Sequence, residues 1–207
     1  MKHLIAALTL TLSTQAFAET TAPEATPATT PTTLPGQIWV GAGAALASPS
    51  SDGLGGQQKV NIDAAYALAA TADYQLNNLI SLRAMPRYIM HLKASESMDS
   101  SSAYDLRVGA TVGKDVMPKI RAYGLAALGY SSISFASPGG GSNQSASGAT
   151  FMIGAGGTYA LSPKMRLYAE AAYELGFQSI SEGGQTADYK VKFLDFGAGL
   201  QIAVGGK

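Results

Sequence analysis

The sequence predicts an all-β protein, an eight-stranded antiparallel up-and-down transmembrane β-barrel. Eight stretches alternate between apolar and polar residues, which is the period of a strand with one apolar and one polar face. The connections between them are alternately long and short, as in a barrel with loops at one end and tight turns at the other. Every arginine lies on a polar face, so we expect the apolar face to look outward at lipid.

Residues 1–18 have the features of a secretory signal peptide. Lys2 and His3 form a basic start, residues 4–12 are an apolar run, and an A-x-A cleavage site ends at Ala18. The apolar run is shorter than the roughly 20 residues that a helix needs to span a bilayer. We therefore expect cleavage after Ala18 and export of the mature chain.

Residues 19–36 form a predicted disordered lead that precedes the barrel domain, residues 37–207. The lead is rich in Pro and Thr, and a proline recurs at every fourth position, namely Pro23, Pro27, Pro31 and Pro35. Such a composition cannot bury enough apolar area to fold on its own. A plain linker is the simplest interpretation, with a binding motif or a cell-wall spacer as alternatives.

The barrel domain divides into eight predicted strands. Their ranges are 38–46, 60–76, 80–92, 104–112, 120–130, 151–161, 165–175 and 194–204. The second and third strands form a long hairpin that turns at Asn77 and Asn78. Pro86 lies in the middle of the third strand, where it removes a hydrogen-bond donor from the ladder. We therefore expect either a bulge at Pro86 or a strand end close to it.

The long connections are predicted to be external loops. They cover residues 48–58, 94–102, 131–148 and 178–187, and they are rich in Ser and Gly. The shorter connections would then be periplasmic turns, and both ends of the barrel domain would lie on the periplasmic side. Any binding specificity for an extracellular ligand would lie in the four loops.

Charged residues on the polar face predict an ion-pair network inside the barrel. The predicted members are Lys59, Asp63, Asp73, Arg83, Arg87, Asp105, Arg107, Arg121, Arg166, Glu170, Glu174 and Asp195. An eight-stranded barrel is just wide enough to be filled by side chains, and a buried charge requires a partner. We therefore expect the pairs to close the lumen. The alternative is a narrow porin-like channel in which rearranged pairs open an ion path.

Aromatic residues on the apolar face predict two belts at the membrane interfaces. The predicted belt residues are Tyr88, Tyr104, Tyr130, Phe151 and Tyr173 near the loops, and Tyr74 and Tyr159 near the turns.

In this pattern the chain resembles the eight-stranded outer-membrane barrels of the OmpA-barrel and OmpX-like type. Its last strand is similar to the assembly signal of that family at Asp195, Gly197, Leu200 and Ile202, with Leu and Ile where aromatic residues are common. The resemblance implies a Gram-negative outer membrane as the location. It also implies outer-membrane lipid and the barrel-assembly machinery as partners.

Two other classes of function have less support. A lipid-modifying membrane enzyme would need a base beside a hydroxyl nucleophile, and the mature chain offers only His91, with Ser95 in the following loop. A soluble exported ligand-binding β-barrel would show the same alternation with apolar residues inside and charges outside. Burial of the two faces distinguishes this alternative from a membrane barrel.

Composition excludes several further classes. The chain has no cysteine, and with a single mature histidine it offers no metal site and no cofactor site. Without residues 1–18 it has 13 basic and 14 acidic residues, which does not suit a nucleic-acid partner. We therefore expect a non-enzymatic outer-membrane barrel with a structural or surface-interaction role.

Overall fold

The computed structural model describes residues 34–53, 60–61, 65–92, 99–136, 144–182 and 185–205. The strands are β1 (Ile38–Gly53), β2 (Val60–Asn61), β3 (Ala65–Gln75), β4 (Ile80–Leu92), β5 (Asp99–Met117), β6 (Ile120–Ala136), β7 (Gln144–Ser162), β8 (Met165–Glu182) and β9 (Gln185–Gly205). The predicted signal peptide and most of the predicted lead lie outside the described residues. In the described part of the chain, no helix is long and apolar enough to cross a bilayer.

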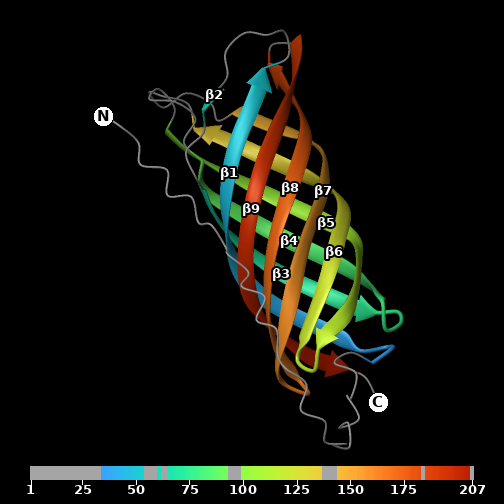
Figure 1. Ribbon diagram of the computed structural model, residues 1–207. Coiled ribbons are helices and arrows are strands. Elements are labelled where there is room, and N and C mark those ends of the chain that lie inside the picture. Colours follow the sequence, from blue (N-terminus) through green and yellow to red (C-terminus); the bar gives the residue numbers. More distant parts are fainter. Residues whose placement is uncertain are drawn as a thin grey trace, which may run out of the picture.

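The long strands form a closed antiparallel barrel, which confirms the predicted fold class (Figure 1). From β3 to β9 each strand pairs with the next, and β1 pairs with both β3 and β9. The contact between β1 and β9 runs from Ile38 to Gly53, so this closing seam is as long as β1 itself. Strand β2 is a short addition that pairs with the upper end of β1 at Ser50 and Ser51.

The strands are tilted relative to the barrel axis, as Figure 1 shows. Moving from Val40 to its paired residue on the next strand, and so on around the barrel, leads back to β1 at a different residue, Ser50. The path passes through Val40, Ala72, Ala84, Val108, Leu128, Phe151, Leu175, Lys192 and Ser50. Such a stagger accompanies tilt in every closed barrel, and it brings residues far apart in the sequence to the same height.

One end of the barrel carries the tight connections β3–β4, β5–β6 and β7–β8, and we call it the turn end. Strand β1 begins there and β9 ends there, whereas the opposite end, the loop end, carries the other connections (Figure 1). The predicted turn at Asn77 and Asn78 is present. The Asn77 Oδ1 accepts hydrogen bonds from the amides of Leu79 and Ile80, at 2.8 and 2.9 Å.

Over the turn end and the middle of the barrel, apolar side chains face outward and charged ones face inward. Leu106 and Val108 are 57% and 60% exposed, whereas Arg107 between them is 2% exposed. The same alternation holds on the neighbouring strand, where Leu128 is 63% exposed and Arg121 is buried. This is the arrangement of a membrane barrel, and it is opposite to the one that a soluble barrel requires.

At the loop end the polarity of the two faces is reversed on the part of the wall that β5, β6 and β7 form. Inside lies an apolar plug of Ala47, Ala65, Ala67, Ile89, Ala103, Ile133, Val191 and Phe193, all buried. Outward positions of β5, β6, β7 and β8 at this end include the hydroxylic residues Ser102, Ser132, Ser134, Ser145, Ser147 and Ser179. On β3, by contrast, Tyr66 and Leu68 face outward beside the plug residues Ala65 and Ala67. Ser134 and Ser145 are both exposed. The barrel therefore continues beyond the apolar surface with a polar exterior.

The predicted external loops were too long. β1 reaches Gly53 and β5 begins at Asp99, and β6, β7, β8 and β9 extend into the predicted loops 131–148 and 178–187. The strands were missed because their outward face is polar at this end. Ser132, Ile133 and Ser134 alternate as strand residues do, but with serine outward and the apolar residue inward.

The predicted bulge at Pro86 is wrong, and so is a strand end near it. Strand β4 runs through Pro86, which pairs with Leu106 of β5. On the other side, pairing with β3 stops after Ala69↔Arg87 and resumes at Ala72↔Ala84 in the same register. The missing amide of proline therefore leaves a local gap in the ladder without displacing either strand.

The predicted strand 60–76 is represented by β2 and β3, with residues 62–64 between them outside the described part.

Inward glycines make room for long side chains from other strands. A Cβ atom at Gly43 would collide with the Tyr168 hydroxyl, and one at Gly199 would collide with the Tyr168 ring. Gly156 similarly leaves space for Tyr123 and Glu170. The glycine content of the strands therefore allows the narrow lumen to hold aromatic and charged groups.

Candidate functional site

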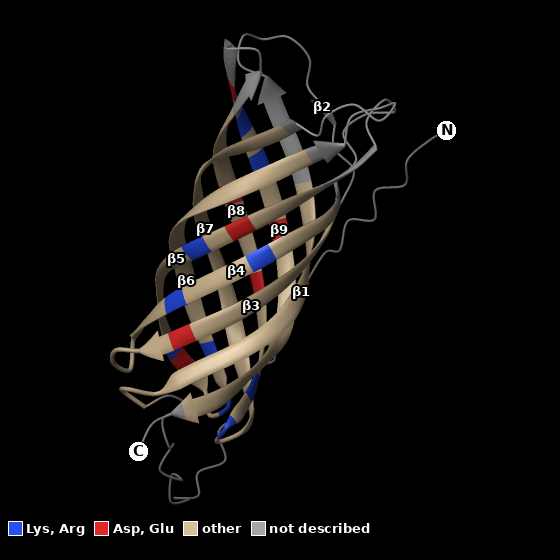
Figure 2. Cartoon of the chain, turned by 180° about the vertical axis from the view of Figure 1, so that it is seen from behind, with Lys and Arg blue, Asp and Glu red and all other residues tan. Residues whose placement is uncertain are grey.

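The charged interior is the candidate site, and blue and red positions in Figure 2 mark its charges along the barrel. The structure places the described members of the predicted network on inward positions of six strands. They are Asp73 (β3), Arg83 and Arg87 (β4), Asp105 and Arg107 (β5), Arg121 (β6), Arg166, Glu170 and Glu174 (β8), and Asp195 (β9). The predicted members Lys59 and Asp63 lie outside the described residues. Apart from Arg121, the others form two clusters at different heights rather than one network.

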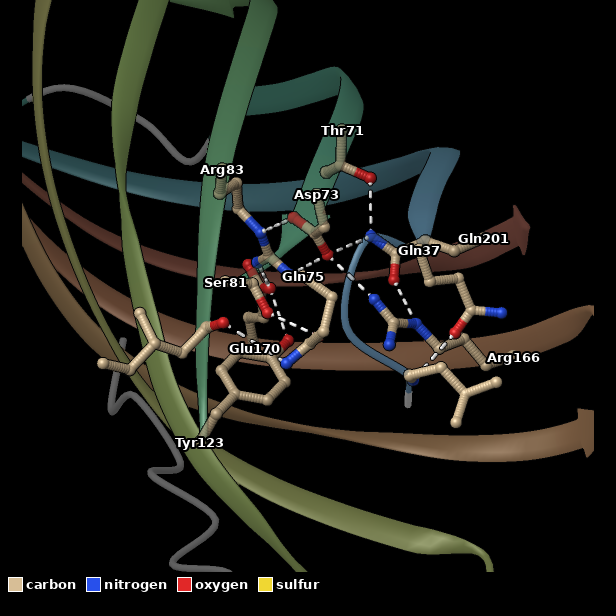
Figure 3. Close-up of polar contacts among 12 residues, drawn as sticks. Gln37, Thr71, Asp73, Gln75, Ser81, Arg83, Tyr123, Arg166, Glu170 and Gln201 are labelled. Atoms are coloured by element: carbon tan, nitrogen blue, oxygen red, sulfur yellow. Dashed lines mark hydrogen bonds and ion pairs between the residues drawn. The ribbon is translucent and has the colours of Figure 1, made fainter. Parts of the chain in front are cut away.

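The first, the lower cluster, consists of Asp73, Arg83, Arg166 and Glu170 (Figure 3). It lies toward the turn end, because Asp73 is near the end of β3 and Arg83 near the start of β4. The Asp73 carboxylate accepts two bonds from Arg83, from Nε at 2.5 Å and from Nη2 at 2.9 Å. It accepts a third from Arg166 Nη2 at 2.9 Å. Arg83 Nη1 donates to Glu170, so two arginines face two carboxylates and the formal charges cancel.

Neutral polar and aromatic groups surround the lower cluster. Gln201 Nε2 donates to Asp73 and to Thr71, each at 2.9 Å, and Gln201 Oε1 accepts from Arg166 Nε at 2.7 Å. The Tyr123 hydroxyl donates to Glu170 Oε1 at 2.5 Å (Figure 3). The Arg166 guanidinium lies 4.1 Å from the ring centre of Trp39, a cation–π contact. The lower cluster therefore fills the lumen with paired groups.

The second, the central cluster, consists of Arg87, Asp105, Arg107, Glu174 and Asp195. Arg87 Nη2 donates to Glu174 at 2.7 Å and to Asp105 at 3.1 Å, while Arg87 Nη1 donates to Asp195 Oδ2 at 2.5 Å. Arg107 Nη2 donates to both Asp105 and Glu174. All five residues are buried.

The central cluster differs from the lower cluster in its charge balance. Its two arginines face three carboxylates, so one negative charge has no formal counterpart within the cluster. Polar atoms without a hydrogen-bond partner also gather here, namely Asp105 Oδ1, Asp195 Oδ1, Arg87 Nε and Arg107 Nε. Among the side chains that the structure describes, these four atoms find no hydrogen-bond partner.

A cavity of about 40 Å³ separates the two clusters. Its polar lining comes from Arg87, Arg107 and Asp195 of the central cluster and from Glu170 of the lower cluster. The apolar part of its lining includes Met85 and Met152. A space of this volume exceeds what a water molecule needs, and it offers water charged partners.

Arg121 belongs to neither cluster. Its guanidinium donates to the carbonyl oxygens of Asn78 and Leu79 at 2.8 and 3.1 Å, and it lies 3.7 Å from the Asp115 carboxylate. It therefore ties β6 to the β3–β4 turn at the turn end. Asp115 was not among the predicted residues, because the sequence placed it in a turn.

The predicted belt residues face outward. Tyr104, Tyr130, Phe151, Tyr173, Tyr74 and Tyr159 are between 39% and 63% exposed, and Tyr88 is half-buried. Tyr88 and Tyr104 are paired across β4 and β5 with ring centres 4.7 Å apart. Tyr66, Phe177 and Phe196 are also outward and exposed but were not predicted.

The residues of the predicted assembly signal lie on both faces of β9. Leu200 and Ile202 are exposed on the outward face, whereas Asp195 is buried in the central cluster. Gly197 is half-buried and lines the cavity.

Sequence reasoning did not list the uncharged residues that line the lumen with the clusters. Trp39, Gln75, Tyr123, Tyr168 and Gln201 all occupy inward positions, and the alternation of their strands would have placed them there. The His91 side chain and Ser95 lie outside what the structure describes. Within the described part of the chain, no three His, Cys, Asp or Glu side chains are arranged to hold a metal ion.

Fold and interior together define an outer-membrane β-barrel, with charged groups paired inside and an apolar surface outside. The chain belongs to the family of outer membrane protein beta-barrel domains, whose sequence profile matches residues 4–202. This confirms the family resemblance noted from the sequence. None of the curated proteins matches the chain.

Solved structures of outer-membrane proteins share the fold. Neisserial surface protein A is 21% identical, with a TM-score of 0.55 over 80% of this chain and 96% of that one. OprG from Pseudomonas aeruginosa is 15% identical, with a TM-score of 0.59 over 83% and 97%. Ail, the attachment invasion locus protein of Yersinia pestis, is 20% identical in its complex with a heparin analogue, with a TM-score of 0.50 over 82% and 100%.

Proposed function

We propose that this protein is a closed outer-membrane barrel with a structural or surface-interaction role, exported by a cleaved signal peptide. The observation that carries the proposal is the sequence of barriers in the lumen. From the turn end upward these are the lower cluster, the central cluster and the apolar plug. A conducting pore requires a continuous polar path, and the apolar side chains of the plug, beside the inward pair Ser131 and Gln178, disfavour one.

Conductance in planar bilayers tests the closed lumen. Purified full-length protein that shows a heat-dependent band shift is expected to be electrically silent after insertion. Val108→Ala, a change on the outward face, is a matched control for insertion and should also be silent. Discrete conductance steps from the unmodified protein would instead support the alternative function, a narrow porin-like channel gated by the ion pairs.

The loop end supports the surface-interaction part of the proposal. There the barrel presents serines outward, with Lys190 exposed and located 5.8 Å from the Phe177 ring centre. Two of the structural neighbours carry the names surface protein and attachment invasion locus protein. An extracellular ligand would contact this end and the connections beyond it.

Loop replacement tests this role. Residues 54–59, 93–98 and 137–143 would be replaced by Gly/Ser segments of equal length. Cells producing either form would be compared for retention on surfaces coated with heparin, collagen or albumin. An interaction role predicts selective retention that is lost on replacement while the heat-dependent band shift persists. Equal retention on every surface would favour a purely structural role.

The remaining partners follow from the apolar exterior. Outer-membrane lipid would surround the outward face, and the barrel-assembly machinery would act during insertion. We propose no enzymatic activity and no cofactor.

A further inference from the structure

We propose that the turn end of the barrel binds the phosphate headgroups of anionic phospholipids through three exposed lysines, Lys114, Lys119 and Lys164, which we call the lysine rim. Figure 2 shows blue positions at the tight turns of this end. The inference rests on the proposed membrane location of the barrel, and it adds a preference for negatively charged lipid in the leaflet at the turn end.

Two of the three tight turns share one sequence pattern. Residues 118–123 read Pro-Lys-Ile-Arg-Ala-Tyr, and residues 163–168 read Pro-Lys-Met-Arg-Leu-Tyr. Proline suits the turn, and the arginine and tyrosine of each segment are buried in the lumen. The lysine of each segment lies in the turn itself and is exposed.

Backbone hydrogen bonds fix these two lysines at the same place in their turns. The Lys119 carbonyl accepts from the amide of Ala160 on β7 at 2.8 Å, and the Lys164 carbonyl accepts from the amide of Ala203 on β9 at 2.9 Å. In the third turn the equivalent carbonyl is that of Leu79, which accepts from an amide of β5 at 2.8 Å. A position held by lysine in two turns is thus held by an exposed leucine in the third.

Lipid-facing residues flank the lysine rim. Lys114 lies on the outward face of β5 between Val112 and Val116, which are 58% and 50% exposed. The lysines of the two turns follow the exposed residues Met117 and Leu161 by two and three positions. Because a strand rises about 3.3 Å per residue, each lysine lies within roughly 10 Å of the apolar surface. Its methylene stem can therefore cover apolar groups while its ammonium group reaches the lipid headgroups.

Charge complementarity identifies the kind of lipid. Residues 113–120 and 159–165 contain three lysines and one acidic residue, Asp115. The Asp115 carboxylate lies 3.7 Å from the Arg121 guanidinium, which compensates its charge. The lysine rim therefore presents positive charge at headgroup level. Such a surface attracts lipids that carry a net negative charge more strongly than zwitterionic lipids.

Lipid retention by the full-length protein tests the lysine rim. The protein would be inserted into vesicles of equal amounts of phosphatidylglycerol and phosphatidylcholine and extracted in mild detergent, and its bound lipids would be counted by native mass spectrometry. The unmodified protein is expected to retain more phosphatidylglycerol. The double variant Lys119→Gln/Lys164→Gln is expected to lower the ratio of the two lipids, by up to about fivefold for each lysine. Added salt should lower the ratio of the unmodified protein as well.

Three further variants separate charge and position. Lys119→Arg/Lys164→Arg keeps both charges and should keep the ratio, whereas Leu79→Lys adds a lysine at the equivalent position and should raise it. Ser134→Glu changes the net charge by as much as one Lys→Gln change, but it lies on the polar exterior of the loop end and should leave the ratio unchanged. A heat-dependent band shift verifies insertion of each variant.

Equal retention of the two lipids by the unmodified protein overturns the inference, and so does an unchanged ratio in Lys119→Gln/Lys164→Gln. The predicted lead, with Glu19 and Glu24, is the other candidate occupant. An excess of phosphatidylglycerol that appears only in Glu19→Gln/Glu24→Gln would assign the lysine rim to the lead and overturn the inference too. A protein that retains neither lipid and shows no band shift would instead contradict the membrane location itself, so the two failures are distinguishable.

Discussion

The lipid-facing region and the loop-end extension of this barrel have opposite polarity. In the first, Val108 faces outward and Arg107 inward, whereas in the second Ser134 faces outward and Ile133 inward. Both regions belong to the same continuous strands, so backbone structure does not cause the difference. The surrounding medium causes it. Burying an apolar side chain stabilises the folded protein only where that side chain would otherwise contact water.

This difference explains why the interior is built in two ways. Where lipid surrounds the barrel, the lumen holds the two ion-pair clusters beside a smaller apolar group of Met85, Leu125, Ala127, Met152 and Ala172. Where water surrounds it, the apolar plug stabilises the barrel as a hydrophobic core does in a soluble protein. The following changes are predicted to act differently in the two regions.

The largest effect is expected from Asp73→Asn in the lower cluster. This change removes the charge that both Arg83 and Arg166 contact, and leaving buried charges uncompensated costs about 3–5 kcal/mol. Urea unfolding in lipid vesicles measures it through the fluorescence of Trp39, the sole tryptophan. Asp115→Asn, a partly exposed carboxylate near Arg121, is the control and should cost less than about 1 kcal/mol. Equal effects of the two variants would contradict the role given to buried pairing.

A smaller loss is expected from Ile133→Ala in the apolar plug. The change creates a cavity in a buried apolar cluster, which costs about 2–5 kcal/mol. The matched change Leu128→Ala lies on the same strand but faces outward, where lipid fills the space left by the truncation. The same unfolding assay should therefore show a smaller loss for Leu128→Ala. The reverse order would mean that the plug does not act as a core.

An introduced charge is expected to lower stability more on the lipid-facing surface than on the outer surface of the loop end. Val108→Arg places a charge on the lipid-facing surface and is expected to cost about 2–4 kcal/mol. Ser134→Arg places the same group on the exposed surface of the loop end, where a substitution is expected to change stability by about 0.5 kcal/mol or less. Folding yield and unfolding midpoint in vesicles measure both. A similar loss of stability in both variants would contradict the difference between the lipid-facing surface and the outer surface of the loop end.

Sequence alternation was sufficient to predict the barrel and the inward direction of its charges. It placed Arg83 and Arg87 on the same face of one strand, but it could not show that they belong to different clusters. The height of a residue in the barrel depends on the register of every strand pair, and register comes from pairing rather than from alternation. The unequal numbers of arginines and carboxylates in the central cluster could not be predicted for the same reason. From the sequence, only the total of basic and acidic residues over the whole interior can be counted.

The extent of the strands at the loop end was also not predicted. Alternation was present in the segment around Ile133, but apolar residues were taken to mark the outward face. A reversal of polarity along one strand marks the point at which its surroundings change from lipid to water. Serines that alternate with apolar residues next to a lipid-facing strand are thus a signal for a strand that continues into solvent.

The most direct test of this account is thiol labelling of single cysteines along β6. The chain has no native cysteine, so Leu128→Cys and Ser134→Cys each introduce one thiol, both on the outward face of that strand. After insertion into vesicles, a membrane-impermeant maleimide is expected to label Ser134→Cys rapidly and Leu128→Cys only after unfolding. Equal labelling of both in the folded protein would contradict a lipid-facing middle and a solvent-facing loop end.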